Sequence, residues 1–400
     1  MVVLNCGDNY FVTGGSDSYM FGLTELLEGN NHKVIPFAPK NENNFATKWD
    51  KYFPDCFEKK KASISKSYKY FYNKDAKVKL FNLLDDVHID VAHLHIYYGS
   101  LTGAIFEPFQ KRGIPVVQSL HEYKLACPVY TMVSNGTVCE ACEGHKFWKA
   151  IPRKCKQGAY LRTMFSVAEA YTTRWLGSID KVDHFIAVSD FMRKKMLQYN
   201  IGEGKISTIH NFVDPDFFEP SGVTGEYFLY FGRLERLKGL FTLIEASSRI
   251  PEIPLIIVGT GDAYFELNNT IQEKRLNHIS LVGFKSGDEL EKLIKGSICT
   301  VVPSEWYENC PMSVLESLAY AKPVIGANIG GIPELIVNEQ DGFLFEAGSV
   351  DELEEKLRWL GFNTAKAKEM GDKGRKKIEK RFSKEVHYQK IMDVYKNLIN

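Results

Sequence analysis

The sequence has no net charge, because its 50 lysine and arginine side chains are balanced by 50 aspartate and glutamate side chains. Non-specific binding to nucleic acid relies on a surplus of positive charge, which this chain lacks. Apolar runs are also short: none approaches the roughly 20 residues of a membrane-spanning helix. The most apolar segments, such as Pro254–Gly259, have the length of a single strand. The composition therefore argues against a nucleic-acid partner and against a membrane-spanning protein.

The beginning of the sequence does not have the pattern of a secretory leader. Met1–Cys6 runs directly into glycine, without a charged start, an apolar stretch and a small-residue cleavage site. Internal repeats and low-complexity tracts are also missing. We therefore expect a cytoplasmic protein, and a peripheral contact with the inner face of the membrane stays open.

The length of the chain predicts two α/β domains, because single hydrophobic cores stop growing at roughly 250–300 residues. Short runs rich in β-branched and aromatic residues alternate with longer segments of helical period, which is typical of a doubly wound parallel sheet. The runs that we expect to be strands are Val2–Cys6, Lys33–Pro39, Asp90–Ile96, Pro115–Leu120, His184–Ser189 and Lys205–His210, followed by Tyr227–Gly232, Pro254–Gly259, His278–Phe284, Ile298–Ser304, Pro323–Ala327 and Gly342–Glu346.

Asp214–Gly225 separates these two series of runs and is rich in proline and glycine, as interdomain linkers are. We therefore predict a first domain at residues 1–218 and a second at residues 219–382. Residues 383–400 have apolar side chains at helical spacing, and we expect this helix to pack back on the first domain. The polar, lysine-rich segment 40–75 is either a solvated insertion or a contact for a membrane or an acceptor.

Glu308 and Glu316 follow the expected strand Ile298–Ser304. Their positions predict that both carboxylates lie at the carboxyl edge of a parallel sheet, where α/β proteins bind ligands. Carboxylates accept hydrogen bonds from sugar and ribose hydroxyls, and the N–H groups at the start of a helix bind phosphate. The spacing alone is equally compatible with a solvated helix that carries two unrelated glutamates.

Arg233 and Lys238 lie directly after the first strand of the second series, within Gly232–Gly239. A guanidinium binds phosphate oxygens in a fork, and an ammonium adds a point charge, so this pair suits a departing diphosphate. As an isolated pattern, the segment would be a strand-to-helix turn with surface cations.

Gly14 and Gly15 follow the first expected strand, and His121 follows the strand Pro115–Leu120. Glycine lets the backbone approach a phosphate or a sugar closely. His121 is therefore expected at the ligand-binding edge of the first sheet, although a hydrogen-bonded structural histidine is the simpler interpretation of such a residue.

A cysteine-rich insertion at about 122–158 contains Cys127, Cys139, Cys142 and Cys155. Four thiolates at this spacing can form a tetrahedral structural zinc site. Free thiols and two disulfides are the alternatives. We expect zinc, in a structural role, because four thiolates leave no open position for water.

In chain order, these motifs resemble those of retaining glycosyltransferases of family 4, also called glycosyl transferases group 1, along nearly the whole sequence. Glu308 and Glu316 are similar to the two glutamates of the family, and Gly232–Gly239 is similar to its Gly-Arg-Leu-x-x-x-Lys-Gly motif. The resemblance implies a GT-B architecture, in which two doubly wound, Rossmann-like domains face each other across a cleft. The family often has Gly-Phe-Gly after the first glutamate, whereas this chain has Asn309-Cys310-Pro311.

The resemblance assigns a role to each residue. It implies that Glu308 contacts the donor sugar, Glu316 the ribose, and Arg233 and Lys238 the diphosphate, while His121 polarises or positions the sugar. The expected donor-binding residues are Gly14, Gly15, Gly259, Gly261 and Phe284, together with Glu316 and the backbone of Cys310, Met312 and Ser313, since Pro311 has no N–H.

The function implied by the resemblance is transfer of a hexosyl or N-acetylhexosaminyl group from a nucleoside-diphosphate sugar to a glycan or lipid-linked saccharide, in surface-polysaccharide synthesis. We expect no cofactor or catalytic divalent ion, because no Asp-x-Asp motif follows a suitable strand. Two alternatives stay open. One is a sugar-nucleotide epimerase of similar fold, and the other is a zinc-stapled interaction protein without catalysis.

Overall fold

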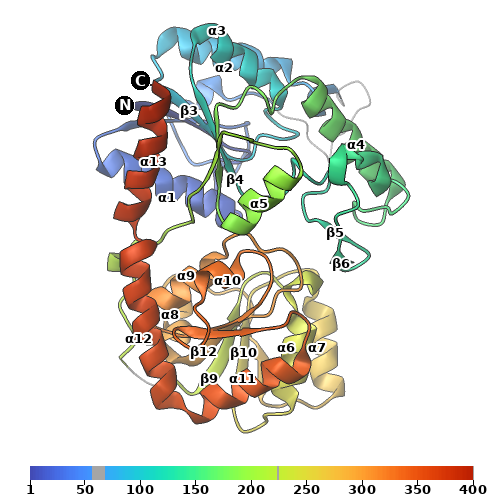
Figure 1. Ribbon diagram of the computed structural model, residues 1–400, viewed down its shortest axis with the longest axis vertical. Helices are drawn as coiled ribbons and strands as arrows, with labels where there is room; N and C mark the ends of the chain where they lie inside the picture. Colours follow the sequence, from blue (N-terminus) through green and yellow to red (C-terminus); the bar gives the residue numbers. More distant parts are fainter. Residues whose placement is uncertain (56–67, 223–224, 400) are drawn as a thin grey trace. The chain divides into compact units, whose positions relative to one another are not determined.

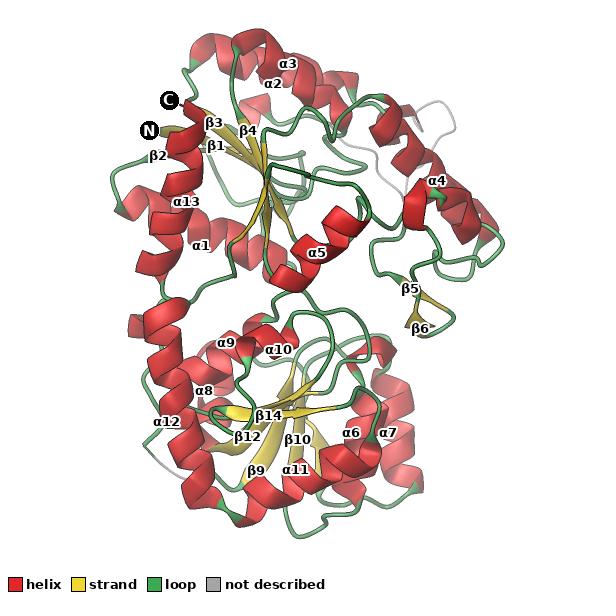
Figure 2. Cartoon of the chain, viewed as in Figure 1, coloured by secondary structure: helices red, strands yellow, loops and turns green. Residues whose placement is uncertain are grey.

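The computed structural model describes residues 1–55, 68–222 and 225–399. The chain divides into two compact units. Unit 1 comprises Met1–Met132, Cys139–His210 and Tyr388–Asn400, and unit 2 comprises Val133–Val138 and Asn211–His387. Each unit consists of a sheet flanked by helices (Figures 1 and 2). The lysines at 59–61 of the predicted insertion lie outside the described residues.

Unit 1 contains a six-stranded sheet in the order β2-β1-β3-β4-β7-β8, and every neighbouring pair is parallel. Its strands are β1 (Val2–Cys6), β2 (Lys33–Phe37), β3 (Val91–Leu94), β4 (Val116–Leu120), β7 (His184–Ala187) and β8 (Ile206–Thr208). A separate antiparallel hairpin of β5 (Val133–Ser134) and β6 (Thr137–Val138) makes up the short segment that is assigned to unit 2.

Unit 2 contains a second six-stranded parallel sheet, in the order β11-β10-β9-β12-β13-β14. This is the strand order of a Rossmann sheet. Its strands are β9 (Tyr227–Phe231), β10 (Leu255–Val258), β11 (Ile279–Leu281), β12 (Ser297–Val302), β13 (Val324–Ala327) and β14 (Gly342–Phe345). The strands expected from the sequence in both halves are therefore confirmed, with ends that shift by a few residues.

Helices alternate with the strands in both units. Those of unit 1 are α1 (Gly15–Gly29), α2 (Lys74–Asp86), α3 (Phe106–Arg112), α4 (Tyr160–Trp175) and α5 (Asp190–Gln198), with short 3-10 turns at η1 (Asp50–Tyr52), η4 (Gly103–Ile105), η5 (Glu143–His145) and η6 (Phe147–Ala150). Those of unit 2 are α6 (Leu240–Ser248), α7 (Tyr264–Glu273), α8 (Gly287–Gly296), α9 (Met312–Ala319), α10 (Ile332–Leu335), α11 (Val350–Phe362) and α12 (Thr364–Arg381), with 3-10 turns at η7 (Pro215–Phe217) and η8 (Arg236–Lys238).

The last helix, α13 (Lys384–Ile399), begins in unit 2 and continues through unit 1. Two of its tyrosines bind residues of unit 1. The Tyr388 hydroxyl lies 2.8 Å from His32 Nε2, and the Tyr395 hydroxyl lies 2.5 Å from His93 Nδ1. Helices of the described chain fall short of the length and apolar character that a bilayer crossing demands.

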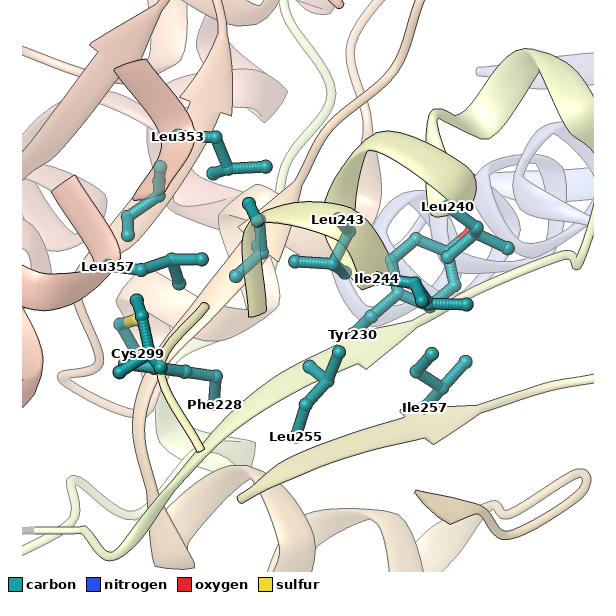
Figure 3. Packing of buried hydrophobic residues seen from close by; sticks show 14 of the residues in the cluster. Phe228, Tyr230, Leu240, Leu243, Ile244, Leu255, Ile257, Cys299, Leu353 and Leu357 are labelled. Carbon is teal, nitrogen blue, oxygen red and sulfur yellow. The ribbon is translucent and has the colours of Figure 1, made fainter. Parts of the chain in front are cut away.

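Figure 3 shows part of the core of unit 2, in which side chains of α6 and α11 pack with those of β9, β10 and β12. Helices α6 and α11 carry leucine and isoleucine at a spacing of three and four residues, which places these side chains on one face. Burial of each such side chain contributes roughly 1.5–3 kcal/mol. The labelled residues of this core are Leu240, Leu243 and Ile244 of α6, Leu353 and Leu357 of α11, and Phe228, Tyr230, Leu255, Ile257 and Cys299 of the strands.

Candidate active site

The order of the strands in unit 2 identifies where a ligand would bind. Successive strands are added on one side of β9 as far as β11, and the chain then returns to the other side of β9 with β12. Doubly wound sheets bind ligands at the carboxyl ends of the two strands that flank such a switch point. Arg233 and Lys238 follow β9, and Glu308 follows β12. The predicted diphosphate and sugar residues therefore lie on the two loops that flank the switch point.

Lys238 and Glu308 form a largely buried ion pair, in which Lys238 Nζ lies 2.6 Å from Glu308 Oε1. The Ser304 hydroxyl and the Trp306 indole N–H donate to the same oxygen at 2.6 and 2.8 Å. Burial alone would raise the pKa of Glu308, but Lys238, Ser304 and Trp306 together lower it below its usual value. Glu308 is therefore an ionised carboxylate held in a fixed orientation.

Two glycines hold the backbone of Glu308 in place. The Gly331 N–H donates to the Glu308 carbonyl at 2.7 Å. Gly330 has a φ of +62°, and a Cβ there would lie 2.3 Å from that carbonyl oxygen. Only glycine permits this approach. The sequence analysis did not single out Gly330 and Gly331, although a glycine pair just after the expected strand Pro323–Ala327 was a usable signal.

Arg233 extends into solvent from the loop after β9, and its Nη1 lies 2.9 Å from Glu235 Oε1. The loop is packed closely against the one that follows β10. A Cβ on Gly259 would lie 1.8 Å from the Gly232 carbonyl oxygen, and a Cβ on Gly261 would lie 2.3 Å from the Leu234 carbonyl oxygen. Packing within the chain is therefore sufficient to explain these two glycines. A donor contact for them stays a prediction.

Helix α9 carries the remaining residues predicted for the donor on this side of the sheet. Pro311 precedes the helix, which places Met312 and Ser313 in its first turn, where N–H groups have no acceptor within the helix. The Cys310 carbonyl accepts a hydrogen bond from Asn211 Nδ2 at 3.0 Å, so its orientation is fixed. Glu316 lies farther along the helix, and burial raises its pKa to about 7.

Phe284 lies apart from this buried cluster. It follows β11 and is largely exposed, with 71% of its surface accessible. Gly283, the residue before it, has a φ of +74°, and its carbonyl accepts a hydrogen bond from the Gly259 N–H at 2.8 Å. The backbone of this segment is therefore fixed against the loop after β10. The exposed Phe284 ring is not held in the core of the unit.

In unit 1, Gly14 and Gly15 lie between β1 and α1, and Gly15 is the first residue of the helix. The Thr13 N–H and hydroxyl both donate to Asp17 Oδ2, at 2.9 and 2.5 Å, and this closes the loop. Gly14 has an extended backbone, and a Cβ there would have no heavy atom of the described chain within 4 Å. Neither conformation nor internal packing requires glycine at position 14.

His121 lies directly after β4 and is hydrogen-bonded to His95, with 3.0 Å between His121 Nε2 and His95 Nδ1. His95 in turn lies 2.6 Å from Asn5 Oδ1. The Tyr19 ring covers His121, with the two ring centres 5.0 Å apart. Burial lowers the pKa of His121 to about 4, so the imidazole is neutral at physiological pH. The sequence analysis identified His121 but not its partners.

Glu122 is a further titratable group at this edge that the sequence analysis did not select. Burial raises its pKa to about 7, and the carboxylates of Asp8 and Glu169 add to this shift, while Lys124 and Lys156 oppose it. Its place next to His121 in the sequence was the available signal. Its ionisation depends on the fold and could not be deduced from that place.

The structure does not support the predicted zinc site at Cys127, Cys139, Cys142 and Cys155. Among the residues that the structure describes, no group of three or more histidine, cysteine, aspartate or glutamate side chains is arranged to hold a metal ion. Cys142 instead lies in a small apolar cluster with Phe147, Ala150, Val167 and Ala170. Burial raises the pKa of Cys142 to about 12, and the neighbouring thiols of Cys127, Cys155 and Cys139 add to this shift.

The two parallel six-stranded sheets with flanking helices are those of GT-B glycosyltransferases. A solved structure of this class, Alr3699/HepE of Anabaena in complex with UDP, superposes with a TM-score of 0.68 and 16% sequence identity, over 99% of this chain and 100% of the other chain. At this identity the similarity shows the fold alone.

The family model "Glycosyltransferase Family 4" matches residues 13–217, and the model "Glycosyl transferases group 1" matches residues 215–377. The chain therefore belongs to glycosyltransferase family 4. An uncharacterised glycosyltransferase of Methanocaldococcus jannaschii is 31% identical over 54% of this chain and 60% of its own length. The UDP-Gal:alpha-D-GlcNAc-diphosphoundecaprenol alpha-1,3-galactosyltransferase of Escherichia coli is 30% identical over 70% of this chain and 68% of its own length.

Proposed function

We propose that the chain is a retaining glycosyltransferase that moves a hexosyl or N-acetylhexosaminyl group from a UDP-sugar to a glycan or lipid-linked saccharide. The observation that carries this proposal is the buried Lys238–Glu308 pair at the switch point of the second sheet. It combines a fixed anion for sugar hydroxyls with a cation for phosphate. Support for UDP comes from the names of the E. coli relative, which uses UDP-Gal, and of the Anabaena structure, which contains UDP.

The donor diphosphate is the group that Lys238 and Arg233 would bind. An ammonium has three N–H donors, so Lys238 can keep its bond to Glu308 and still donate to a phosphate oxygen. Arg233 is exposed, and its other partner is the side chain of Glu235 in the same loop. The first N–H groups of α9 supply further donors next to Glu308. Glu316 accepts hydrogen bonds from the ribose in this proposal.

The chemical step replaces one bond to the anomeric carbon with another on the same face of the sugar. The bond from the anomeric carbon to the UDP oxygen breaks, and a bond to the acceptor oxygen forms. The acceptor proton passes to the departing phosphate oxygen. Arg233 and Lys238 stabilise the negative charge that develops on this phosphate. Glu308 holds the sugar hydroxyls, and neutral His121 positions the sugar without taking up the proton.

Unit 1 would supply the acceptor side of the reaction. At Gly14, no atom of the described chain would clash with a side chain. A ligand phosphate or sugar that approaches the backbone there would explain why the residue is glycine. The acceptor class is suggested by the E. coli relative, whose name specifies a diphosphoundecaprenol-linked sugar. We therefore propose a role in the assembly of a surface polysaccharide on a lipid carrier.

Donor choice is tested by thermal unfolding in the presence of UDP-, GDP-, ADP- and dTDP-sugars. The proposal expects UDP-sugars to raise the unfolding temperature most. Transfer is then measured for Glu308→Gln, Arg233→Ala and Lys238→Ala, each of which should lower kcat by about a hundredfold to a thousandfold. Arg236→Ala is the matched control, because Arg236 lies in the same loop but is paired with Glu266 in solvent. Near-normal turnover in all three variants would overturn the mechanism.

A further inference from the structure

Helix α4, which belongs to unit 1 (Figure 1), exposes an apolar stripe along its whole length. Leu161 and Trp175, near its two ends, have 72% and 85% of their surfaces accessible. The spacing of the exposed side chains is that of one helical face. The exposed apolar residues of the helix are Tyr160, Leu161, Met164, Phe165, Tyr171 and Trp175.

The opposite face of α4 fixes the helix to unit 1. Glu169 on this face is buried, and its Oε2 lies 2.5 Å from Nζ of the buried Lys124. The Thr173 hydroxyl donates to the other carboxylate oxygen at 3.1 Å. Removing either partner of such a buried ion pair is costly, so the pair determines which face of the helix is inside. The apolar stripe is therefore the outer face.

The segment that contains the stripe carries almost entirely positive charge. From Lys146 to Trp175 the sequence has a single acidic residue, Glu169, which is the buried one. The basic residues of this segment are Lys146, Lys149, Arg153, Lys154, Lys156, Arg162 and Arg174. Lys154 Nζ also lies 4.5 Å from the centre of the Tyr160 ring. The balanced total charge of the chain thus conceals a strongly basic surface.

We propose that α4 lies in the surface of an anionic lipid bilayer, with its apolar stripe in the headgroup region and the flanking lysines and arginines on lipid phosphates. Exposed aromatic and leucine side chains next to basic ones are the features of interfacial helices. Anionic headgroups attract such basic clusters. This surface goes beyond the proposed function, because it concerns where the enzyme works and needs no catalysis to be tested.

Co-sedimentation of the full chain with vesicles tests the proposal. We compare vesicles of phosphatidylcholine alone with vesicles of phosphatidylcholine and phosphatidylglycerol in equal parts. The wild type should bind the anionic vesicles and lose this binding in high salt. Leu161→Gln with Trp175→Gln should weaken binding by about tenfold or more, since two interfacial anchors are removed. Phe265→Gln on α7 is the matched control, because Phe265 is equally exposed but lies in unit 2.

Three outcomes would overturn this proposal. The wild type does not sediment with anionic vesicles, or the double variant binds them as the wild type does. In the third, sedimentation velocity shows a dimer that the double variant loses, which would make the stripe a contact between two copies. Thermal unfolding of each variant verifies the fold. Hydrolysis of the donor is also measured without vesicles. If the proposed catalytic function is correct, each variant should keep this activity, whichever of the three outcomes is observed.

A second, independent observation concerns the hydrogen bonds behind His121. Asn5 Nδ2 donates to the Thr24 hydroxyl oxygen at 2.9 Å and to the Met20 carbonyl at 3.3 Å. The Thr24 hydroxyl donates to the same carbonyl. The amide nitrogen of Asn5 is thereby placed on the α1 side, and its Oδ1 is the atom that faces His95 Nε2. His95 Nε2 must therefore carry a proton and donate it.

This arrangement fixes the tautomer of His121. Burial and the neighbouring His93 and His121 hold the pKa of His95 well below its usual value, so His95 is neutral. With its proton on Nε2, His95 has an acceptor at Nδ1, which lies 3.0 Å from His121 Nε2. His121 Nε2 is consequently the donor of that bond. A neutral imidazole has one N–H, so Nδ1 is the acceptor nitrogen of His121.

We infer that Asn5 and His95 are positioning residues that hold His121 as the neutral imidazole with its proton on Nε2. The inference rests on the proposed role of His121 next to the sugar. The titratable groups around this relay are His93, stacked on His95 with 4.6 Å between ring centres, Tyr19 over both His95 and His121, and Tyr395 of α13, which binds His93. None of these three groups is a carboxylate.

Nitrogen NMR of the full chain labelled at histidine measures the tautomer directly. In the wild type, His121 should have a protonated Nε2 and an unprotonated Nδ1 at neutral pH. Asn5→Leu removes the acceptor and should mix the two tautomers and lower kcat by about tenfold or more, with a smaller change in KM. Asn5→Asp keeps an acceptor and should restore the tautomer. Tyr395→Phe is the control, because it changes the partner of His93 and leaves the relay intact.

Protonation of His121 at Nδ1 in the wild type would overturn the inference whatever the variants do. An Asn5→Leu chain that folds and keeps both the tautomer and the turnover would overturn it as well. Absence of transfer in a wild type that shows the expected tautomer would instead count against the proposed function, and the two failures are therefore distinguishable.

Discussion

Glu308 and Glu316 differ in ionisation, although burial disfavours the charged form of both. Glu308 accepts three hydrogen bonds on one oxygen, one of them from Lys238, and its pKa is lowered. Glu316 receives none from the described residues, and burial raises its pKa to about 7. A carboxylate with that pKa is only partly ionised at neutral pH. If Glu316 binds the donor as proposed, donor binding should be sensitive to pH near 7.

The sign of this dependence follows from the proposed contact. A ribose hydroxyl donates to a carboxylate, so the donor binds the ionised form of Glu316 more tightly. As the pH falls through about 7, Glu316 takes up a proton and the KM for the donor should rise, approaching tenfold per pH unit. Above that pH the KM should become constant. Steady-state kinetics of Glu316→Gln should show a high KM without this dependence, and an unchanged pH profile in the variant would contradict the assignment.

Gly14 permits a test of ligand approach without damage to the fold. A methyl group at this position meets no heavy atom of the described chain, so Gly14→Ala should leave the unfolding temperature within a few degrees of the wild type. A ligand that contacts the backbone there would be displaced, and the KM for the donor or the acceptor should rise by about tenfold or more. Gly29→Ala on the same helix has equally open surroundings and is the control. Equal kinetics for the two variants would dismiss the contact.

At the residue scale, sequence motifs identified Arg233, Lys238, Glu308 and His121 but not their partners. The ion pair between Lys238 and Glu308 joins residues that follow different strands, and it depends on β9 and β12 being neighbours. Ser304 and Trp306 lie within the predicted segment, yet their donation to one oxygen of Glu308 is a matter of turn geometry. Pairing of this kind is set by topology and cannot be deduced from spacing.

At the scale of elements, the loops after β9, β12 and β13 pack on one another through glycines. Gly239 has a φ of +68°, and a Cβ there would lie 1.8 Å from the Pro303 carbonyl oxygen. Gly330 has the same relation to Glu308. These contacts position the loops of the proposed site by backbone packing. They also explain why a site built on loops can be rigid.

Gly330→Ala should therefore affect stability and activity together. Its φ of +62° and the contact with the Glu308 backbone make the change both strained and overpacked, at a cost of roughly 2–4 kcal/mol in the free energy of unfolding. Turnover should fall because Glu308 is displaced. Gly348→Ala has a φ of +82° but open surroundings, so it isolates the cost of strain at about 1 kcal/mol. Denaturant unfolding measures both, and equal losses would contradict the packing argument.

Elements of regular structure were predicted well because their signals are local. The expected strands recur with nearly the same bounds, since buried parallel strands read as short apolar runs between turns. For the cysteine-rich insertion, the described residues do not support the predicted metal site. Its thiols suggested a metal, whereas the structure shows an apolar cluster around Phe147 and Val167 and a charged Lys124–Glu169 pair. Neither has a periodic pattern that a sequence would reveal.

At the scale of the whole molecule, two sheets of the same class carry different kinds of residue at the carboxyl ends of their strands. Unit 2 presents cations and a fixed carboxylate, and unit 1 presents a neutral histidine and an open glycine loop. This division agrees with donor binding by one unit and acceptor binding by the other in the proposed function. The basic, apolar surface of α4 belongs to unit 1 as well, which would bring the acceptor side of the enzyme to a membrane.

The stereochemistry of the first product tests the central claim most directly. Proton NMR of the reaction of the full chain with an α-linked UDP-sugar and a saccharide acceptor reports the configuration at the anomeric carbon as the product forms. The proposed mechanism predicts an α-linked product and no conversion of the donor in the absence of acceptor. A β-linked product would contradict retention, and an isomerised UDP-sugar without acceptor would show an epimerase instead.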